Sequence, residues 1–131
     1  MDNTFSLVLP DESDSPLRQI LALVRRSDSI AVKSEGTRVL VNATKSLWST
    51  DPKTLDGERA SRREAATTAL VTEPCVSALA RLIGRSKRYP TLVNEGVVAL
   101  SLISTHPSGG TSRAAHAATQ YPALTRAFCA L

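Results

Sequence analysis

Two stretches of this chain share the same order of features: residues 16–36 read PLRQILALVRRSDSIAVKSEG, and residues 74–96 read PCVSALARLIGRSKRYPTLVNEG. Each begins with a proline, which is typical of a first helical turn, and passes through an Arg-Ser joint to a Glu-Gly pair that opens an apolar segment. One helix pair cannot bury both of its apolar faces alone, so a recurring pair favours stacked units, as in an α-solenoid. The alternative is two unrelated amphipathic hairpins in one helical bundle.

Apolar residues recur at helical spacing through most of the chain. Ser15 and Pro16 predict a helix over 16–26, because serine is a common N-cap and proline suits the first helical position. A second helix is expected from Ile30 to about Ser49, with inward residues Val32, Gly36, Val39, Leu40, Ala43 and Leu47. The capping-box pattern from Ser61 to Glu64 predicts a third helix, ending near Val71. Further helices are expected from Pro74 to residues 84–87, over 91–105, and as two short segments within 112–131 divided at Tyr121-Pro122.

The composition favours an all-α protein. Aromatic residues make up only 4% of the chain, which is low for a β-sandwich, whose strands are enriched in aromatic side chains. No apolar run approaches the ~20 residues of a membrane span. Residues 1–15 contain four acids and no base, so we expect a disordered acidic segment there and a helical domain over 16–131.

Cysteine and histidine are sparse, and their positions do not suggest a metal or catalytic site. Cys75 and Cys129 lack metal-binding spacing, and His106 and His116 have no carboxylate or thiol at ligand spacing. The N-terminus lacks the pattern of a secretion signal. We therefore expect a cytoplasmic, non-enzymatic protein without a cofactor or metal.

The longest expected helices carry a family resemblance. Residues 34–49, SEGTRVLVNATKSLWS, followed by residues 69–104, ALVTEPCVSALARLIGRSKRYPTLVNEGVVALSLIS, resemble the C-terminal armadillo repeats of smgGDS-type small-GTPase GDP dissociation stimulators. In that family a Glu, then Arg three residues later, then an aliphatic run opens one repeat helix, as Glu35, Arg38 and Leu40 do here. An Asn-Glu pair opens the next, as Asn94 and Glu95 do. The resemblance implies an armadillo-like α-solenoid segment with one complete and two partial repeats.

The resemblance also implies a function. It predicts a protein-binding module that contributes to the binding of Rho- or Rap-type small GTPases and to guanine-nucleotide release. Such exchange factors act by binding the nucleotide-poor state more tightly than the loaded one, so no catalytic residue is implied. The incomplete repeats predict either further armadillo repeats as partners or self-association through exposed ends.

A polar stripe on the second helix is the candidate binding surface. Glu35, Arg38, Asn42 and Lys45 fall on one side, away from the expected core, and an amide there can both donate to and accept from a partner's backbone. Together with Asn94 and Glu95, these residues are the predicted partner contacts. The alternative for this stripe is a solvated face with a local Glu35–Arg38 pair.

Two basic clusters leave another function open. The residues concerned are Arg59, Arg62 and Arg63 in one cluster and Arg81, Arg85, Lys87 and Arg88 in the other. They are compatible with a basic helical module that binds nucleic acid, although no interleaved aromatic residues are present for base stacking. A solvated basic edge is the favoured explanation. A structural solenoid fragment without independent activity is the third alternative.

Overall fold

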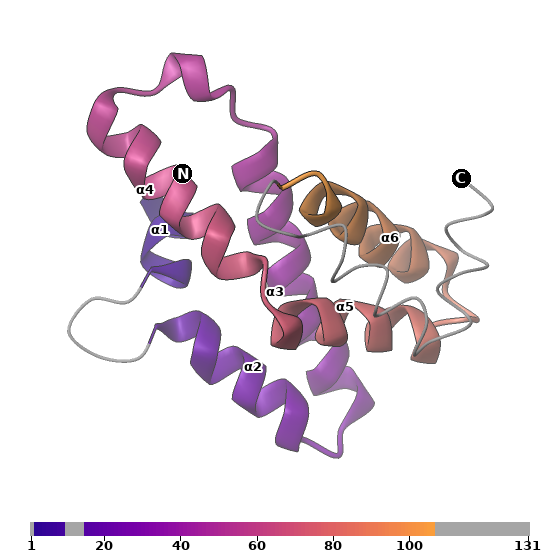
Figure 1. Ribbon diagram of the computed structural model, residues 1–131. Helices are drawn as coiled ribbons and strands as arrows, with labels where there is room; N and C mark the ends of the chain where they lie inside the picture. The colour runs from indigo at the N-terminus through magenta and orange to yellow at the C-terminus, as the bar shows by residue number, and fades with distance from the viewer. Residues whose placement is uncertain (1, 10–14, 107–131) are drawn as a thin grey trace.

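The computed structural model describes residues 2–9 and 15–106, and over these residues the chain is helical with no β-strand (Figure 1). The elements are α1 (Asp2–Val8), α2 (Pro16–Arg26), α3 (Ile30–Trp48), the 3-10 turn η1 (Pro52–Thr54), α4 (Gly57–Leu70), α5 (Glu73–Arg85) and α6 (Pro90–Ser104). The predicted all-α class is confirmed for this part of the chain. The two short helices predicted within 112–131 lie outside the described residues.

Local capping explains where several helices begin. The Ser15 hydroxyl accepts from the backbone N–H of Arg18 at 3.4 Å, and the Ser29 hydroxyl accepts from that of Val32 at 3.3 Å, so α2 and α3 begin where the sequence predicts. The predicted start of α4 was wrong by five residues, because the N-cap is Asp56 and not Ser61. Asp56 accepts from the Arg59 N–H at 2.8 Å and starts α4 at Gly57, which places Ser61 inside the helix.

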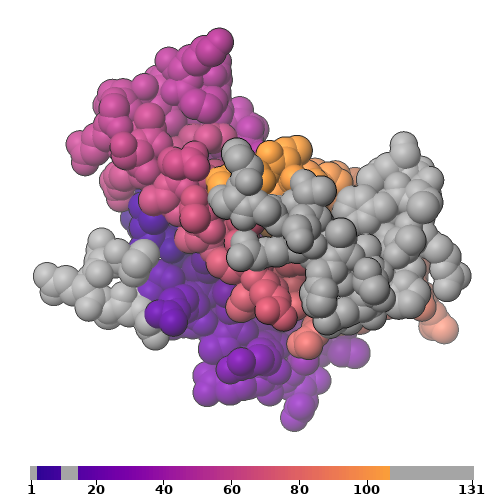
Figure 2. Space-filling view, viewed as in Figure 1, coloured from indigo at the N-terminus to yellow at the C-terminus, as the bar shows by residue number. Residues whose placement is uncertain are grey.

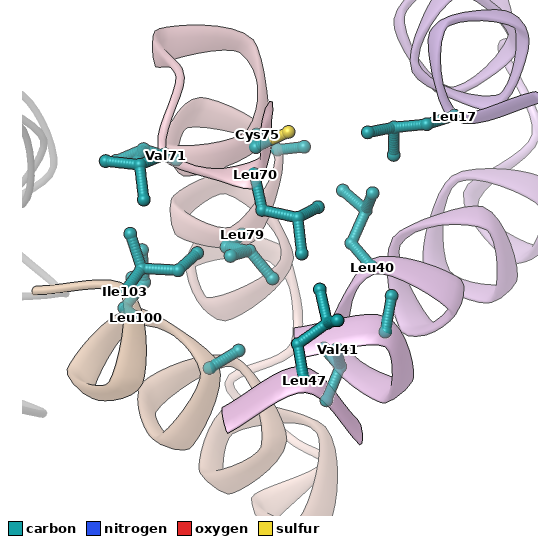
Figure 3. Packing of buried hydrophobic residues seen from close by; sticks show 14 of the residues in the cluster. Leu17, Leu40, Val41, Leu47, Leu70, Val71, Cys75, Leu79, Leu100 and Ile103 are labelled. Atoms are coloured by element: carbon teal, nitrogen blue, oxygen red, sulfur yellow. The ribbon is translucent and has the colours of Figure 1, made fainter. Parts of the chain in front are cut away.

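The core is formed by apolar side chains from every helix, and Figure 3 shows its central part. Leu40 and Leu47 of α3 meet Leu79 of α5 and Leu100 of α6, and all four are at most 1% exposed. After α3 the chain turns through η1 and runs back along α4 (Figure 1). Helices that are far apart in sequence therefore contribute to the same core.

The inward face of α3 differs in part from the predicted one. Leu40, Ala43 and Leu47 are buried as expected, whereas Val32 is 37% exposed because it lies near the start of the helix, beyond the core. Thr37 and Thr44 are fully buried instead. Their hydroxyls donate to backbone carbonyls four residues earlier, at 2.7 and 2.8 Å, so burial leaves neither hydroxyl without a partner.

The N-terminal segment corrects a second expectation. Disorder was predicted for residues 1–15, but Asp2–Val8 forms α1, and both Phe5 and Val8 are buried in the core. The guanidinium of Arg62 in α4 lies 5.0 Å from the Phe5 ring centroid, a cation–π distance. The acidic composition of this segment indicated disorder. The burial of Phe5 and Val8 could not be predicted from the segment alone, because it depends on surfaces supplied by other helices.

We predict that Phe5→Ala lowers the free energy of unfolding by about 3 kcal/mol, because it removes a fully buried ring. The measurement is urea unfolding followed by circular dichroism. Asn3→Ala is the matched control on the same helix, since Asn3 is exposed. Equal stability of the Phe5→Ala protein and the wild type would show that α1 does not dock in solution.

The two helical hairpins, α2–α3 and α5–α6, use the same close contact. A Cβ added at Gly36 of α3 would lie 2.5 Å from Val24 Cγ2 of α2, and one added at Gly96 of α6 would lie 2.7 Å from Ile83 Cγ1 of α5. Real Cβ atoms essentially never come so close to another heavy atom. Each glycine of the two Glu-Gly pairs therefore lets the second helix of a hairpin approach the first.

We predict that Gly96→Ala lowers the free energy of unfolding by about 1 to 2 kcal/mol, because Ile83 must move in a packed core. Gly84→Ala is the matched control. It also replaces a helical glycine, but its Cβ meets nothing within 4 Å, so stability should stay constant or rise by up to about 1 kcal/mol. The two variants are compared by thermal and urea unfolding. A stabilised Gly96→Ala protein would contradict the close approach of α5 and α6.

Candidate functional site

The polar stripe predicted on α3 lies at the surface. Glu35, Asn42 and Lys45 are exposed, and Arg38 is partly exposed. They occupy positions on one side of α3 because they are separated by three or four residues, the spacing at which helical side chains are neighbours. The core residues Leu40 and Leu47 face the opposite way, into the protein.

The structure brings one of the two residues predicted on α6, Glu95, to the same surface, and Asn94 beside it in sequence is exposed. Arg38 Nε donates to Glu95 Oε2 at 3.2 Å, and Arg38 Nη1 donates to Glu35 Oε1 at 3.2 Å. The Arg38 side chain is therefore held between a carboxylate of its own helix and one of α6. The hydrogen bond that Arg38 donates to Glu35 and the negative charge of Glu95 raise the pKa of Arg38 above its already high usual value, so it stays protonated.

A second contact joins α3 and α6 at their other ends. Trp48 Nε1 donates to Thr105 Oγ1 at 3.2 Å, and the Trp48 ring meets that of His106 edge to face, with centroids 6.3 Å apart. Arg38 and Glu95 are 57 residues apart in sequence, and so are Trp48 and Thr105. Because this offset is the same at both places, α3 and α6 lie side by side and run in the same direction (Figure 1). We call the surface formed by Glu35, Arg38, Asn42, Lys45 and Glu95, together with the exposed Asn94 that precedes Glu95, the α3–α6 face.

The α3–α6 face offers recognition chemistry. Asn42 presents an amide that donates and accepts, Lys45 presents a cation, and Asn94 adds a second exposed amide from α6. Within the described ranges no three His, Cys, Asp or Glu residues gather closely enough to hold a metal ion. These groups suit hydrogen bonding to a partner's backbone and side chains.

Three other residues with side chains that can take part in catalysis or ligand binding, Trp48, Cys75 and His106, are packed into the protein. His106 is buried, with its Nε2 3.4 Å from Glu64 Oε1, and Trp48 packs against the core. Cys75 is also buried, and desolvation raises the pKa of its thiol, so the reactive thiolate is disfavoured there. His116 and Cys129 lie outside the described residues.

The structure gives different contacts to members of the two basic clusters that the sequence suggested. Arg63 Nε donates to the Leu47 carbonyl at 3.0 Å and Arg62 covers Phe5, so these two have structural contacts. Arg81 and Arg85 line a groove between α2 and α5, a feature that sequence reasoning missed. The available signal was the arginine before the serine of each Arg-Ser joint, at Arg26-Ser27 and Arg85-Ser86. That Arg25, next to the first joint, shares a groove with Arg85 depends on the packing of α2 on α5.

Comparison with known proteins gives no identification: no protein-family model matches the chain, and neither the curated proteins nor the solved structures include a match. None of the helices in the described residues combines the length and the hydropathy needed to cross a bilayer.

We predict that Arg38→Glu lowers the melting temperature, because it places a third carboxylate beside Glu35 and Glu95. Adding Glu95→Arg to this variant should recover part of the loss by reversing the interhelical pair. Melting is followed by circular dichroism at low ionic strength and at about 1 M NaCl, where the differences should shrink. Arg26→Glu, an exposed change of equal charge on α2, serves as control. Absence of any recovery in the double variant would argue against the Arg38–Glu95 contact.

Proposed function

We propose that this chain is a non-catalytic protein-binding module, an armadillo-like solenoid segment whose α3–α6 face contacts a partner. The single observation that carries the proposal is that α3 and α6, each of which carries a Glu-Gly pair in its second turn, lie side by side in the same direction and together expose a polar surface. Parallel second helices of successive hairpins are what a stacked repeat produces.

The two hairpins support the repeat assignment independently of that surface. Gly36 and Gly96 occupy the same place in their hairpins, and a Cβ added at either would lie at nearly the same short distance, 2.5 or 2.7 Å, from a side chain of the preceding helix. In the proposed register, α4, α5 and α6 are one complete repeat, and α2 and α3 are the last two helices of the repeat before it. The partial repeat proposed after α6 falls on residues outside the described part.

The proposed partner is a small GTPase of the Rho or Rap type, bound in the cytoplasm, and this choice depends on the resemblance to GDP dissociation stimulators. Nucleotide release would follow if the α3–α6 face binds the nucleotide-poor GTPase more tightly than the GDP-loaded form, because a ligand shifts an equilibrium only by its difference in affinity. Arg38 is held by two carboxylates, so it presents its remaining donors in a preorganised position.

The test measures binding of the full chain to Rho- and Rap-type GTPases in GDP-loaded, GTP-analogue-loaded and nucleotide-free forms. We expect the tightest binding to the nucleotide-free form and roughly a tenfold or greater loss in Asn42→Ala with Lys45→Glu. Both residues are exposed, so this variant should fold like the wild type. Gln19→Ala with Arg26→Glu makes the same chemical changes at exposed positions of α2 and should bind normally.

Three outcomes would contradict the proposal in different ways. Absence of GTPase binding together with strongly salt-dependent association with DNA or RNA would favour the nucleic-acid-binding alternative. Absence of both, with self-association that rises with concentration, would favour a structural solenoid fragment. If the Asn42 and Lys45 variant still binds the GTPase, the GTPase is a partner, but it contacts a surface other than the α3–α6 face.

A further inference from the structure

A groove of about 880 Å³ lies between α2 and α5, away from the α3–α6 face. Its floor is apolar, with Val8, Leu17, Leu21, Val24 and Ala78 among the lining residues. Among the described residues that line it are five cations, Arg18, Arg25, Lys33, Arg81 and Arg85, and one acid, Glu73. A basic rim around an apolar floor is complementary to an amphipathic ligand with negative charge.

The groove follows the helices lengthwise. Its α5 lining recurs every four residues, at Glu73, Ser77, Arg81 and Arg85, so it extends along one face of the whole helix. At 1.5 Å per residue this face is about 18 Å long, or roughly three helical turns. Figure 1 shows α2 and α5 running in the same direction, and both helices reach the molecular surface in Figure 2.

Arg85 is a groove residue whose guanidinium is only partly hydrogen-bonded. Its Nη2 donates to the Thr37 hydroxyl at 3.3 Å, whereas its buried Nε has no hydrogen-bond partner among the described residues. Burial and the neighbouring charge of Arg81 lower the pKa of Arg85, which means that its surroundings disfavour the charged form. A carboxylate placed in the groove beside Arg85 would accept a hydrogen bond from its guanidinium. Its negative charge would also offset the repulsion between Arg85 and Arg81.

We propose that this groove binds an acidic amphipathic helix of a partner protein. Cations line both long sides of the groove: Arg18 and Arg25 come from α2, and Arg81 and Arg85 come from α5. This arrangement matches a helix that carries acidic residues on both flanks of an apolar stripe. A small anionic amphiphile would use the cations of one end only. The site shares no residue with the α3–α6 face, so the proposal stands or falls separately from the proposed function.

The experiment measures binding of a fluorescein-labelled peptide of about 14 residues, with leucines at helical spacing and glutamates on both flanks, to the full chain by fluorescence anisotropy. A peptide with the glutamates replaced by lysines is the control probe. We expect the acidic peptide to bind and the basic one not to bind. Arg25→Glu with Arg81→Glu should weaken binding roughly tenfold or more.

The control variant is Lys87→Glu with Arg88→Glu, which changes the net charge equally at exposed positions outside the groove lining and should bind normally. Ala22→Glu introduces an acid into the groove wall without removing a large core side chain and should also weaken binding.

Four results would overturn the proposal. If the Lys87 and Arg88 variant loses as much affinity for the acidic peptide, the binding is due to general charge attraction. If the basic peptide binds equally well, the binding is due to apolar contact alone. Binding of dodecanoate but not of the acidic peptide would assign the groove to a small amphiphile. Self-association that the Arg25 and Arg81 variant abolishes, with no peptide binding, would assign it to a second copy of this chain.

Discussion

The burial of one face of α3 is the constraint on which the rest of the structure depends. α3 contacts every other helix in the described residues, and its Leu40, Val41 and Leu47 are at most 1% exposed. No single neighbour could cover that face, so α2, α5 and α6 must converge on it. The small size of Gly36 permits the close approach of α2 that this convergence requires, and Gly96 does the same for α5 and α6.

This packing leaves two surfaces of different character. Between α3 and α6 the apolar side chains are turned inward, and the outer edge is joined by the Arg38–Glu95 pair, so the α3–α6 face is polar. Between α2 and α5 the helices make less contact with each other than each makes with its own hairpin partner, and an apolar floor stays accessible. One fold therefore presents one surface suited to hydrogen-bonded recognition and another suited to an apolar helix with acidic flanks.

The differences between prediction and structure have particular physical causes. α2 and α3 were predicted to begin at the correct residues, because Ser15, Pro16 and Ser29 act within the first turn. The start of α4 was misplaced because two local signals competed, and the Asp56 cap precedes the capping-box pattern at Ser61. α1 was missed because its amphipathic signal is short, and a helix of seven residues gains most of its stability from the surface on which it docks.

The sequence by itself determined the helical class, the exposure of Glu35, Asn42 and Lys45, and the recurrence of a glycine within each hairpin, because these follow from periodicity and contacts within a few residues. Only the tertiary structure decided that Arg38 meets Glu95 across 57 residues and that Arg25 and Arg85 border one groove. Such contacts depend on how closely helices approach and at what offset, and these are set by the joint packing of many side chains rather than by any one segment.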